Sequence, residues 1–164
     1  MDDVIFILCL VGAIGSGLNA GVFFAFSTFT MSGLGRLPAA QGMAAMQAIN
    51  VAAPRSALFM LLLFGTGLIA LALAVEAAIG LDGAGATMRL AGGIVYVAGA
   101  IVVTVGANVP RNDALAAADP AAADSAALWA GYRRSWVAWN HVRTLACLAA
   151  AVLFTLAPAG PAAS

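Results

Sequence analysis

Long runs without charged residues are the dominant pattern of this 164-residue sequence. A helix needs about 20 apolar residues to cross a bilayer, and four runs reach that length. The first lies between Asp3 and Arg36 and is expected in the membrane from about residue 4 to 29; the others are expected at about residues 56–75, 90–108 and 139–156. The pattern predicts an all-α fold, a four-transmembrane-helix bundle forming one integral membrane domain over residues 1–164.

The composition supports a surface that meets lipid. Hydrophobic residues make up 63% of the chain and charged residues 9%, whereas a soluble domain has roughly 25% charged residues. Too few polar side chains remain to cover the protein in water, so the lipid bilayer is the expected partner. The net charge is zero and no basic stripe exists, so nucleic-acid binding is not expected.

The arginines predict how the chain is oriented. All seven basic residues are arginines, and five of them fall in the two long connections between spans. These five are Arg36, Arg55, Arg111, Arg133 and Arg134. Positively charged loops stay in the cytoplasm, so we expect a multi-pass protein of the cell membrane with both termini extracytoplasmic. The residues before the first span are acidic and its apolar run is long, which indicates a mature helix rather than a signal peptide.

The first long connection is expected to contain a short amphipathic helix. Pro38 can open a helix, because its missing N–H costs nothing in the first turn. Met43, Met46, Gln47 and Asn50 then share one helical face. Two interpretations remain open: an interfacial helix lying under the bundle, or a lid over a cavity.

The second long connection predicts an early start of the fourth helix. Asp119 is a suitable N-cap and Pro120 a suitable first residue. No breaker follows before Trp139, so the helix is expected to begin outside the membrane and run inward as one rod. Between the second and third spans, the residues from Gly80 to Gly85 predict a tight turn.

Aromatic and polar side chains share a stripe on this fourth helix. The members of the stripe are Trp129, Tyr132, Trp136, Asn140 and Arg143, at steps of three or four residues. Trp136 and Trp139 suit an interfacial aromatic belt, but a stripe that continues into polar residues also fits an aromatic wall beside a polar pocket.

The inner ends of all four spans carry polar residues at a similar expected depth. They are Asn19, Arg55, Asn108, Asn140, His141 and Arg143. Ionisable groups inside a membrane are costly and therefore indicate function. All but Asn140 also have a simpler interpretation: Arg55 as an orientation anchor, Asn19 as an interhelical hydrogen bond in a small-residue face, Asn108 as a helix cap. Arg143 can snorkel to the interface, and His141 can be a satisfied core histidine.

The sequence lacks the residues that several kinds of active site require. A single histidine cannot build a histidine-rich metal centre, and Cys9 and Cys147 have no ligand spacing. The chain has no glycine-rich phosphate loop and no serine-nucleophile motif. We therefore expect no metal and no cofactor, although one axial histidine ligand to a haem stays open.

Four segments carry a resemblance to a known family. They are Asn19 within a glycine-rich first span and residues 46–50, 108–112 and 136–144. In these segments the chain resembles the anthrone oxygenase-like membrane proteins. The resemblance implies oxidation of an anthrone to an anthraquinone without an obvious cofactor.

The residues can be matched to that chemistry. An anthrone loses a CH₂ proton to give an electron-rich enolate, and a site for it needs a base, oxyanion donors and flat apolar walls. We expect His141 as the base, because its pKa lies near neutrality, with Arg143, Asn140 and Asn108 holding the oxyanion. The expected substrate-binding set is Asn19, Met43, Met46, Gln47, Asn50, Asn108, Trp136 and Trp139.

The sequence thus predicts a cofactor-independent membrane oxygenase acting on a planar hydrophobic phenolic or quinone-like compound. A non-catalytic membrane protein that binds a lipid, a quinone or a partner helix in the same inner-leaflet pocket is the alternative. A homo-oligomer also stays open.

Overall fold

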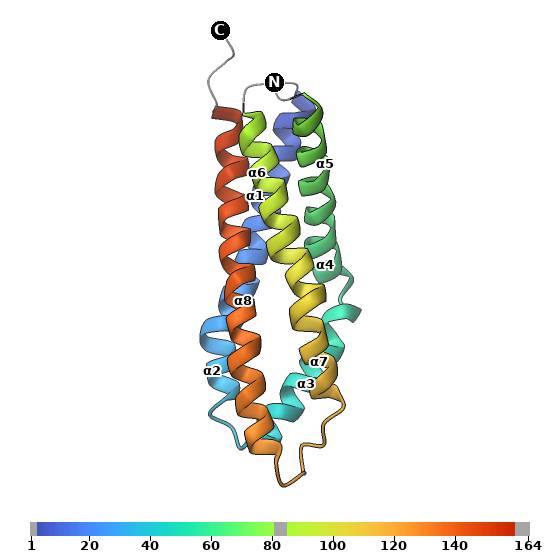
Figure 1. Ribbon diagram of the computed structural model, residues 1–164, viewed down its shortest axis with the longest axis vertical. Coiled ribbons are helices and arrows are strands. Elements are labelled where there is room, and N and C mark those ends of the chain that lie inside the picture. The colour runs from blue at the N-terminus through green and yellow to red at the C-terminus, as the bar shows by residue number, and fades with distance from the viewer. Residues whose placement is uncertain (1–2, 81–84, 160–164) are drawn as a thin grey trace.

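Four long helical spans form the protein in the computed structural model, which describes residues 3–80 and 85–159 (Figure 1). Within these residues, the helices that are long and apolar enough to cross a membrane run over Asp3–Leu34, Ala57–Ile79, Ala86–Ala116 and Ser125–Leu156. No strand occurs in the described part of the chain. The predicted all-α four-helix bundle is confirmed.

Three of the four spans change helix type along their length. The first comprises α1 (Asp3–Ala25), the π-helix η1 (Phe26–Thr30) and α2 (Met31–Leu34); the second comprises α4 (Ala57–Met60), η2 (Leu61–Gly65) and α5 (Thr66–Ile79). The third runs through α6 (Ala86–Tyr96), η3 (Val97–Val102), η4 (Thr104–Asn108) and α7 (Val109–Ala116). The fourth is the single helix α8 (Ser125–Leu156), followed by the short 3₁₀ helix η5 (Ala157–Ala159).

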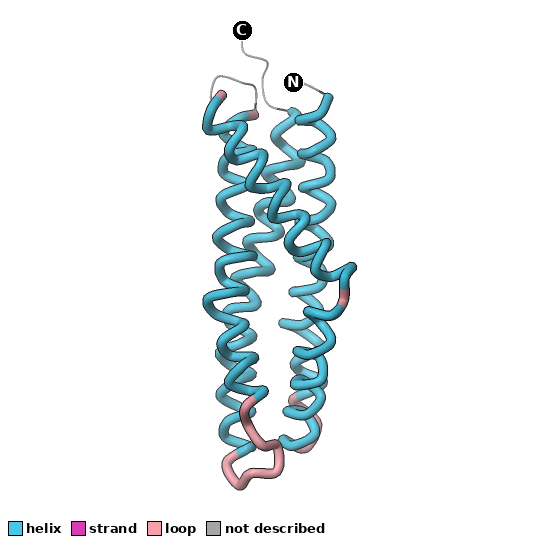
Figure 2. The backbone as a smooth tube through the Cα atoms, turned by 90° about the vertical axis from the view of Figure 1, so that its right-hand side faces the viewer, coloured by secondary structure: helices cyan, strands magenta, loops and turns pink. Residues whose placement is uncertain are grey.

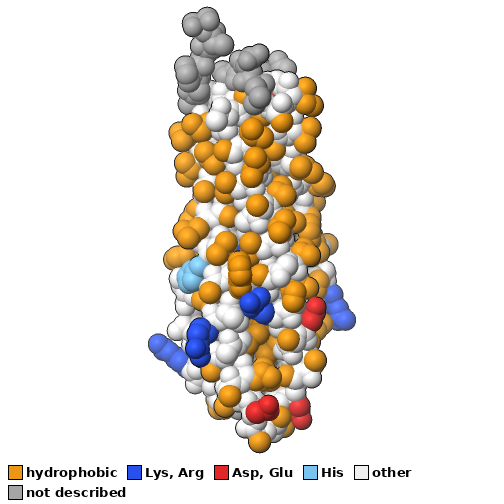
Figure 3. Space-filling view, in the orientation of Figure 1, with side chains coloured by type: hydrophobic (Ala, Val, Ile, Leu, Met, Phe, Trp, Pro, Cys, Tyr) orange, Lys and Arg blue, Asp and Glu red, His pale blue; other side chains and the backbone are white. Residues whose placement is uncertain are grey.

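The two ends of the bundle differ. The start of α1 and the end of α8 lie together at one end, here called the terminal end, and α3 (Ala39–Arg55) and the loop before α8 lie at the other (Figures 1 and 2). In the view of Figure 3, hydrophobic side chains cover the described surface from the terminal end to beyond the middle, and charged side chains gather toward the opposite end. The chain is therefore a multi-pass membrane protein whose apolar helix faces meet lipid.

Small residues allow close helix contacts in the terminal half of the bundle. A Cβ added at Gly15 of α1 would lie 2.2 Å from the Thr66 hydroxyl of α5, and one added at Gly93 of α6 would lie 2.3 Å from the Ala70 carbonyl oxygen. In a bilayer the hydrophobic effect does not drive helices together, so membrane helices associate through close packing at small residues. Arg89 of α6 is buried at this end and pairs with Glu76 of α5 through bonds of 2.7 and 3.1 Å.

The fourth helix starts later than the sequence predicts. The structure begins α8 at Ser125, with Asp124 at the N-cap, so the predicted start at Pro120 is wrong. The Asp119 carboxylate accepts a hydrogen bond from the Ala121 N–H at 2.8 Å. Asp119 therefore caps a local turn, which ends before a helix can propagate.

Two other boundaries also differ from expectation. The third span was expected to end at Asn108, but it continues through Pro110 to Ala116. Pro110 is tolerated because it falls in the first turn of α7, directly after a π-helix. Arg55 does not begin the second span: it is the last residue of α3, and the Ser56 hydroxyl then accepts a bond from the Phe59 N–H at 3.3 Å at the start of α4.

The turn predicted between the second and third spans falls largely on residues 81–84, which lie outside the described residues. Gly85, directly after them, has a φ of +72°. A Cβ there would also lie 2.0 Å from the Ala157 carbonyl oxygen. Glycine is required at this position both for the left-handed backbone and for the close approach of the chain after α8.

Candidate functional site

A cavity of about 380 Å³ lies in the half of the bundle that carries the connections. Small-molecule pockets occupy roughly 300–1,000 Å³, so its size suits a compact ligand. Its wall is mainly apolar and includes Phe23, Phe26, Phe59, Leu63, Phe64 and Trp136. The polar residues that line it are Asn50, Thr104, Asn108, Asn112, Asp113 and Arg143.

π-Helical segments form a large part of this wall. η1 contributes Phe26, η2 contributes Leu63 and Phe64, and η4 contributes Thr104, Val105 and Asn108. A π-turn widens a helix and is frequently found at functional sites. No pattern in the sequence marks these segments, because apolar residues surround them and no period distinguishes a π-turn from an α-turn.

The Arg143 guanidinium is the central polar group of the cavity. Its side chain is only 5% exposed. Nη1 donates to the Thr104 hydroxyl at 3.0 Å, and Nη2 donates to the Asn140 side-chain oxygen. The guanidinium carbon lies 4.1 Å from the ring centre of Phe23 and 5.4 Å from that of Trp136. Arg143 therefore lies inside the bundle and does not snorkel to the interface.

The positive charge on Arg143 has no counter-ion in the described part of the chain. No Asp or Glu among these residues forms an ion pair with it, and its Nε–H has no hydrogen-bond partner. A buried charge is costly unless it is paired and hydrogen-bonded. The site therefore favours a ligand that brings a negatively charged oxygen, or one that becomes negative, to the guanidinium.

Asn108 and Asn112 add amide groups one helical turn apart. Asn108 is buried, its Nδ2 lies 3.4 Å from the Trp136 carbonyl oxygen, and its Oδ1 has no partner. Asn112 Oδ1 accepts bonds from Trp136 Nε1 at 2.8 Å and from the Tyr132 hydroxyl at 2.9 Å. The third span thus supplies an unpaired acceptor and a fixed wall for the same cavity.

Comparison with known proteins identifies the family. The family model described as anthrone oxygenase matches residues 53–153. The chain belongs to the anthrone oxygenase family. The matched segment contains Arg143, Asn108 and Asn112 but not the first span or most of α3. No curated protein and no solved structure matches the chain.

In this family member, His141 does not reach the cavity. Its side chain is exposed and it is absent from the cavity wall, so the expectation that it joins Arg143 is wrong. Successive residues of a helix are rotated by about 100°, so two positions place His141 on roughly the opposite side of α8 from Arg143.

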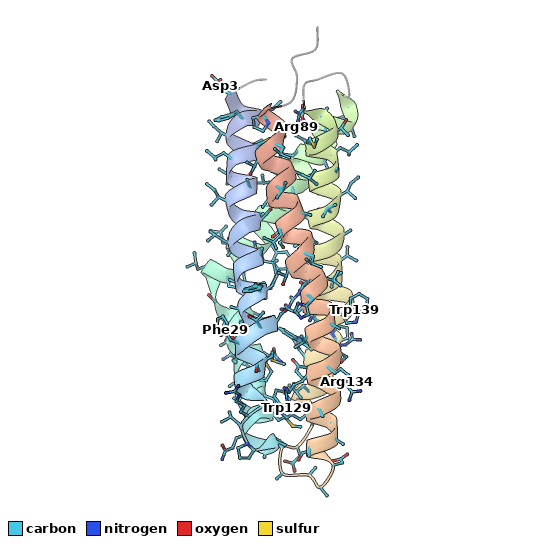
Figure 4. All side chains as sticks on the ribbon, turned by 90° about the vertical axis from the view of Figure 1, so that its left-hand side faces the viewer. Asp3, Phe29, Arg89, Trp129, Arg134 and Trp139 are labelled. Carbon is cyan, nitrogen blue, oxygen red and sulfur yellow. The ribbon has the colours of Figure 1, made fainter. Side chains whose placement is uncertain are left out.

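Trp136 and Trp139 lie in different environments. Trp136 lines the cavity, as predicted from its stripe. Trp139 is 40% exposed and lies outside the cavity wall, with the Arg111 guanidinium 5.8 Å from its ring centre (Figure 4). Its predicted place in the substrate slot is therefore wrong, and its position on the surface fits the aromatic belt.

Asn140 supports the arginine and does not face the ligand space. Its Nδ2 donates to the Phe23 carbonyl oxygen at 2.6 Å and to the Ser27 hydroxyl at 2.5 Å, and its Oδ1 accepts from Arg143. Both amide hydrogens are used, so the expected oxyanion role has no free donor. Asn140 instead joins the first span to the guanidinium.

Asn19 belongs to a different polar cluster. Its Nδ2 lies within 3.1 Å of three acceptors: the carbonyl oxygens of Gly15 and Leu62 and the Tyr96 hydroxyl. The Tyr96 hydroxyl donates to the Leu63 carbonyl oxygen at 3.0 Å. Asn19 does not line the cavity; it connects three spans, which fits the interhelical interpretation and not the predicted ligand contact.

The predicted face of α3 divides into a cavity part and a packing part. Met46 and Asn50 line the cavity. Met43 is buried in an apolar cluster with Trp129 and is not in the cavity wall. Gln47 Nε2 donates to the carbonyl oxygens of Leu115 and Ala118 at 2.8 and 2.9 Å, so it ties α3 to the end of the third span. α3 thus forms part of the cavity wall and is tied to the third span by Gln47.

Sequence reasoning did not assign Asn112 or Asp113 to the site. Both line the cavity from α7, and Asp113 is exposed. The signal was present: Asn112 follows Asn108 by four residues, which places both on one helical face. It was overlooked because the third span was expected to end at Asn108.

Proposed function

We propose that the cavity binds a planar hydrophobic phenolic or quinone-like compound and that the protein oxidises it with dioxygen, without a resident cofactor. The observation that carries the proposal is the Arg143 guanidinium, which is buried in an apolar wall and has no carboxylate partner in the described chain. Membership of the anthrone oxygenase family supports the same reaction class.

We propose that the ligand carries two neighbouring oxygens. The Arg143 Nε–H and the Asn108 side-chain oxygen are buried without partners, and both residues line the cavity. A phenol hydroxyl beside a ring carbonyl supplies the matching acceptor and donor. Phe23, Phe26 and Trp136 provide aromatic surface for the rings.

The proposed reaction starts from a ring CH₂ conjugated to the carbonyl. Loss of one proton gives an enolate, whose oxygen is stabilised by Arg143. The enolate transfers one electron to dioxygen, and recombination of the two radicals forms a C–O bond and, after protonation, a hydroperoxide. Loss of water from the hydroperoxide leaves a ketone, so the balance is CH₂ + O₂ → C=O + H₂O.

Asp113 is our proposed proton acceptor. It is the carboxylate among the described residues of the cavity wall, and it is exposed. A carboxylate is a competent base for a carbon acid whose enolate is stabilised by hydrogen bonds. The protonated Asp113 then returns its proton to the peroxide or passes it to water.

We also propose that the end with α3 lies in the cytoplasm and that both termini lie outside. Five of the seven arginines lie just before or in α3, in α7 or in the first part of α8, and the structure gathers these segments at one end. Labelling of single introduced cysteines from each side of sealed vesicles tests this orientation.

Oxygen consumption by the purified protein tests the proposed reaction. The protein in detergent is mixed with an anthrone carrying a hydroxyl beside its carbonyl, and oxygen uptake is followed together with product mass under isotopically labelled dioxygen. We expect uptake above the spontaneous rate and one labelled oxygen atom per product molecule. No acceleration over a matched empty-membrane preparation would refute the reaction.

A non-catalytic binding role is the second candidate. One observation favours it: few described residues of the cavity wall could move a proton. Arg143 is the one ionisable residue that α8 contributes to that wall, and Asp113, on α7, is exposed. Saturable binding of the anthrone or of a quinone, with no oxygen consumption, would support this role over the oxygenase.

A further inference from the structure

We propose that the headgroup of an acidic phospholipid binds at a second site through its anionic phosphate. This site lies on the surface of the bundle, between the end of the first span and α8. The site is a groove of about 430 Å³. Its wall includes Ser27, Met31, Ser32, Arg133, Arg134 and Val137. It shares no lining residue with the main cavity, so the proposal does not depend on the oxygenase function.

Two arginines without carboxylate partners in the described residues line this groove. In the described residues, no Asp or Glu forms an ion pair with Arg133 or Arg134. The Arg133 guanidinium lies 5.8 Å from the Trp129 ring centre, and its Nε is buried with no hydrogen-bond partner. Arg134 is exposed. A pair of neighbouring guanidiniums is well suited to phosphate oxygens, because each presents several N–H donors.

Serine hydroxyls add donors beside these cations. Ser32 is exposed and makes no hydrogen bond within the described chain. The Ser27 hydroxyl accepts a bond from Asn140 at 2.5 Å and keeps its own proton to donate. Thr28 is excluded as a donor, because its hydroxyl proton is used by the Phe24 carbonyl oxygen at 2.7 Å.

The position of the groove favours a lipid over a free anion. Met31 and Val137 give it apolar wall next to the cations. Phe24 and Phe29 of the first span are 54% and 67% exposed, so the span that forms one wall of the groove also carries exposed apolar surface suited to acyl chains. Figure 4 shows Phe29 and Arg134 in the half of the bundle away from Asp3 and Arg89. Cationic side chains at the membrane surface attract acidic lipids.

Native mass spectrometry of the detergent-purified full chain tests the site. The protein is mixed with phosphatidylglycerol or phosphatidylcholine, and the retained lipid is counted. We expect preferential retention of phosphatidylglycerol, reduced about fivefold by Arg134→Gln, the factor for about 1 kcal/mol per surface cation. Arg133→Gln should give a similar loss; because Arg133 also packs on Trp129, Arg134→Gln is the decisive variant.

Matched controls separate this site from general surface charge. Arg36→Gln and Arg55→Gln remove exposed cations from the same end of the bundle without touching the groove, and both should retain the lipid as the wild type does. Equal losses in Arg36→Gln and Arg134→Gln, or no preference for phosphatidylglycerol, would overturn the proposal.

Competition with inorganic phosphate distinguishes a lipid site from a site for free phosphate. If millimolar phosphate displaces phosphatidylglycerol from the wild type and binds less well to Arg134→Gln, the site is a free-phosphate site and the assignment to lipid fails. If phosphatidylglycerol is retained in that phosphate, the lipid assignment holds.

Discussion

The Arg143 guanidinium donates to the Thr104 hydroxyl at 3.0 Å, and that hydroxyl lies 2.6 Å from the Ala100 carbonyl oxygen, to which it donates. The charged group of the fourth span is thereby fixed to the π-helical part of the third span. Asn140 fixes the same guanidinium to the first span. A donor held from three spans does not need to reorganise when negative charge develops on a ligand, which is the condition for effective electrostatic stabilisation.

Removal of this guanidinium should affect function more than folding. We expect Arg143→Gln to lower kcat/KM for the anthrone about 100-fold, the usual cost of losing an oxyanion donor. Arg143→Lys should recover only part of the loss, because an ammonium cannot bond Thr104, Asn140 and a ligand in the same planar arrangement. Initial rates of oxygen uptake give these values.

Arg111→Gln is the matched control for that experiment. Arg111 bonds the Ala107 carbonyl oxygen at 2.7 Å and does not line the cavity, so its variant should keep kcat/KM within about twofold. A similar decrease in Arg111→Gln and Arg143→Gln would show that loss of positive charge in general, and not the cavity arginine, is responsible.

Substitution of Asp113 should lower turnover, whereas substitution of His141 should leave turnover unchanged. Asp113→Asn should lower kcat by roughly 100-fold, a typical contribution of a general base, while the dissociation constant of a non-reactive quinone changes little. His141→Ala should leave both quantities unchanged, because the imidazole lies on the exposed side of α8. Stopped-flow oxygen consumption and fluorescence titration measure them; loss of turnover in His141→Ala alone would restore the histidine as base.

Asn19 should matter for stability and not for ligand binding. Asn19→Ala removes bonds to the second and third spans, and we expect it to destabilise the protein by about 1–2 kcal/mol, the range for interhelical polar contacts in membranes. Thermal unfolding in detergent measures the effect. Thr155→Ala, which removes an exposed hydroxyl bonded to its own helix at Ala151, should be close to neutral.

The glycines of α1 offer a paired test of helix packing. Gly15→Ala places a methyl group 2.2 Å from the Thr66 hydroxyl, whereas nothing lies within 4 Å of a Cβ at Gly17. We expect Gly15→Ala to destabilise the bundle by about 1–3 kcal/mol through overpacking, and Gly17→Ala to be neutral or slightly stabilising. Adding Thr66→Ala to Gly15→Ala should restore part of the stability; thermal unfolding of the four proteins gives the answer.

The spans could be predicted because charge placement alone limits them. The runs between Asp3 and Arg36, and between Arg55 and Glu76, leave little choice of helix position. The stripe that ends at Arg143 was also predictable, since steps of three or four residues define one face of any α-helix. Its two buried members nearest the cavity, Trp136 and Arg143, are where that pattern indicates.

The predicted site residues were grouped by their expected depth in the membrane, and several assignments failed because the direction of each side chain was not considered. His141 lies close to the level of Arg143, yet a rotation of 100° per residue turns it to the other side of α8. Trp139 lies about 60° round the helix from Trp136, at the edge of the buried stripe, where it is 40% exposed. Asn19 and Asn140 are buried as expected, but their amides are consumed by backbone carbonyls of neighbouring spans, and such partners cannot be read from one sequence. The π-helices shift direction further, because each inserted residue rotates all later side chains of that span about the helix axis.

Gly15, Gly93 and the Arg89–Glu76 pair make close contacts in the half of the bundle that holds the start of α1 and the end of α8. In the other half, the cavity lies between the spans, and α4 and α7 form part of its wall. We therefore predict that a ligand enters between α4 and α7 while the closely packed half keeps its contacts.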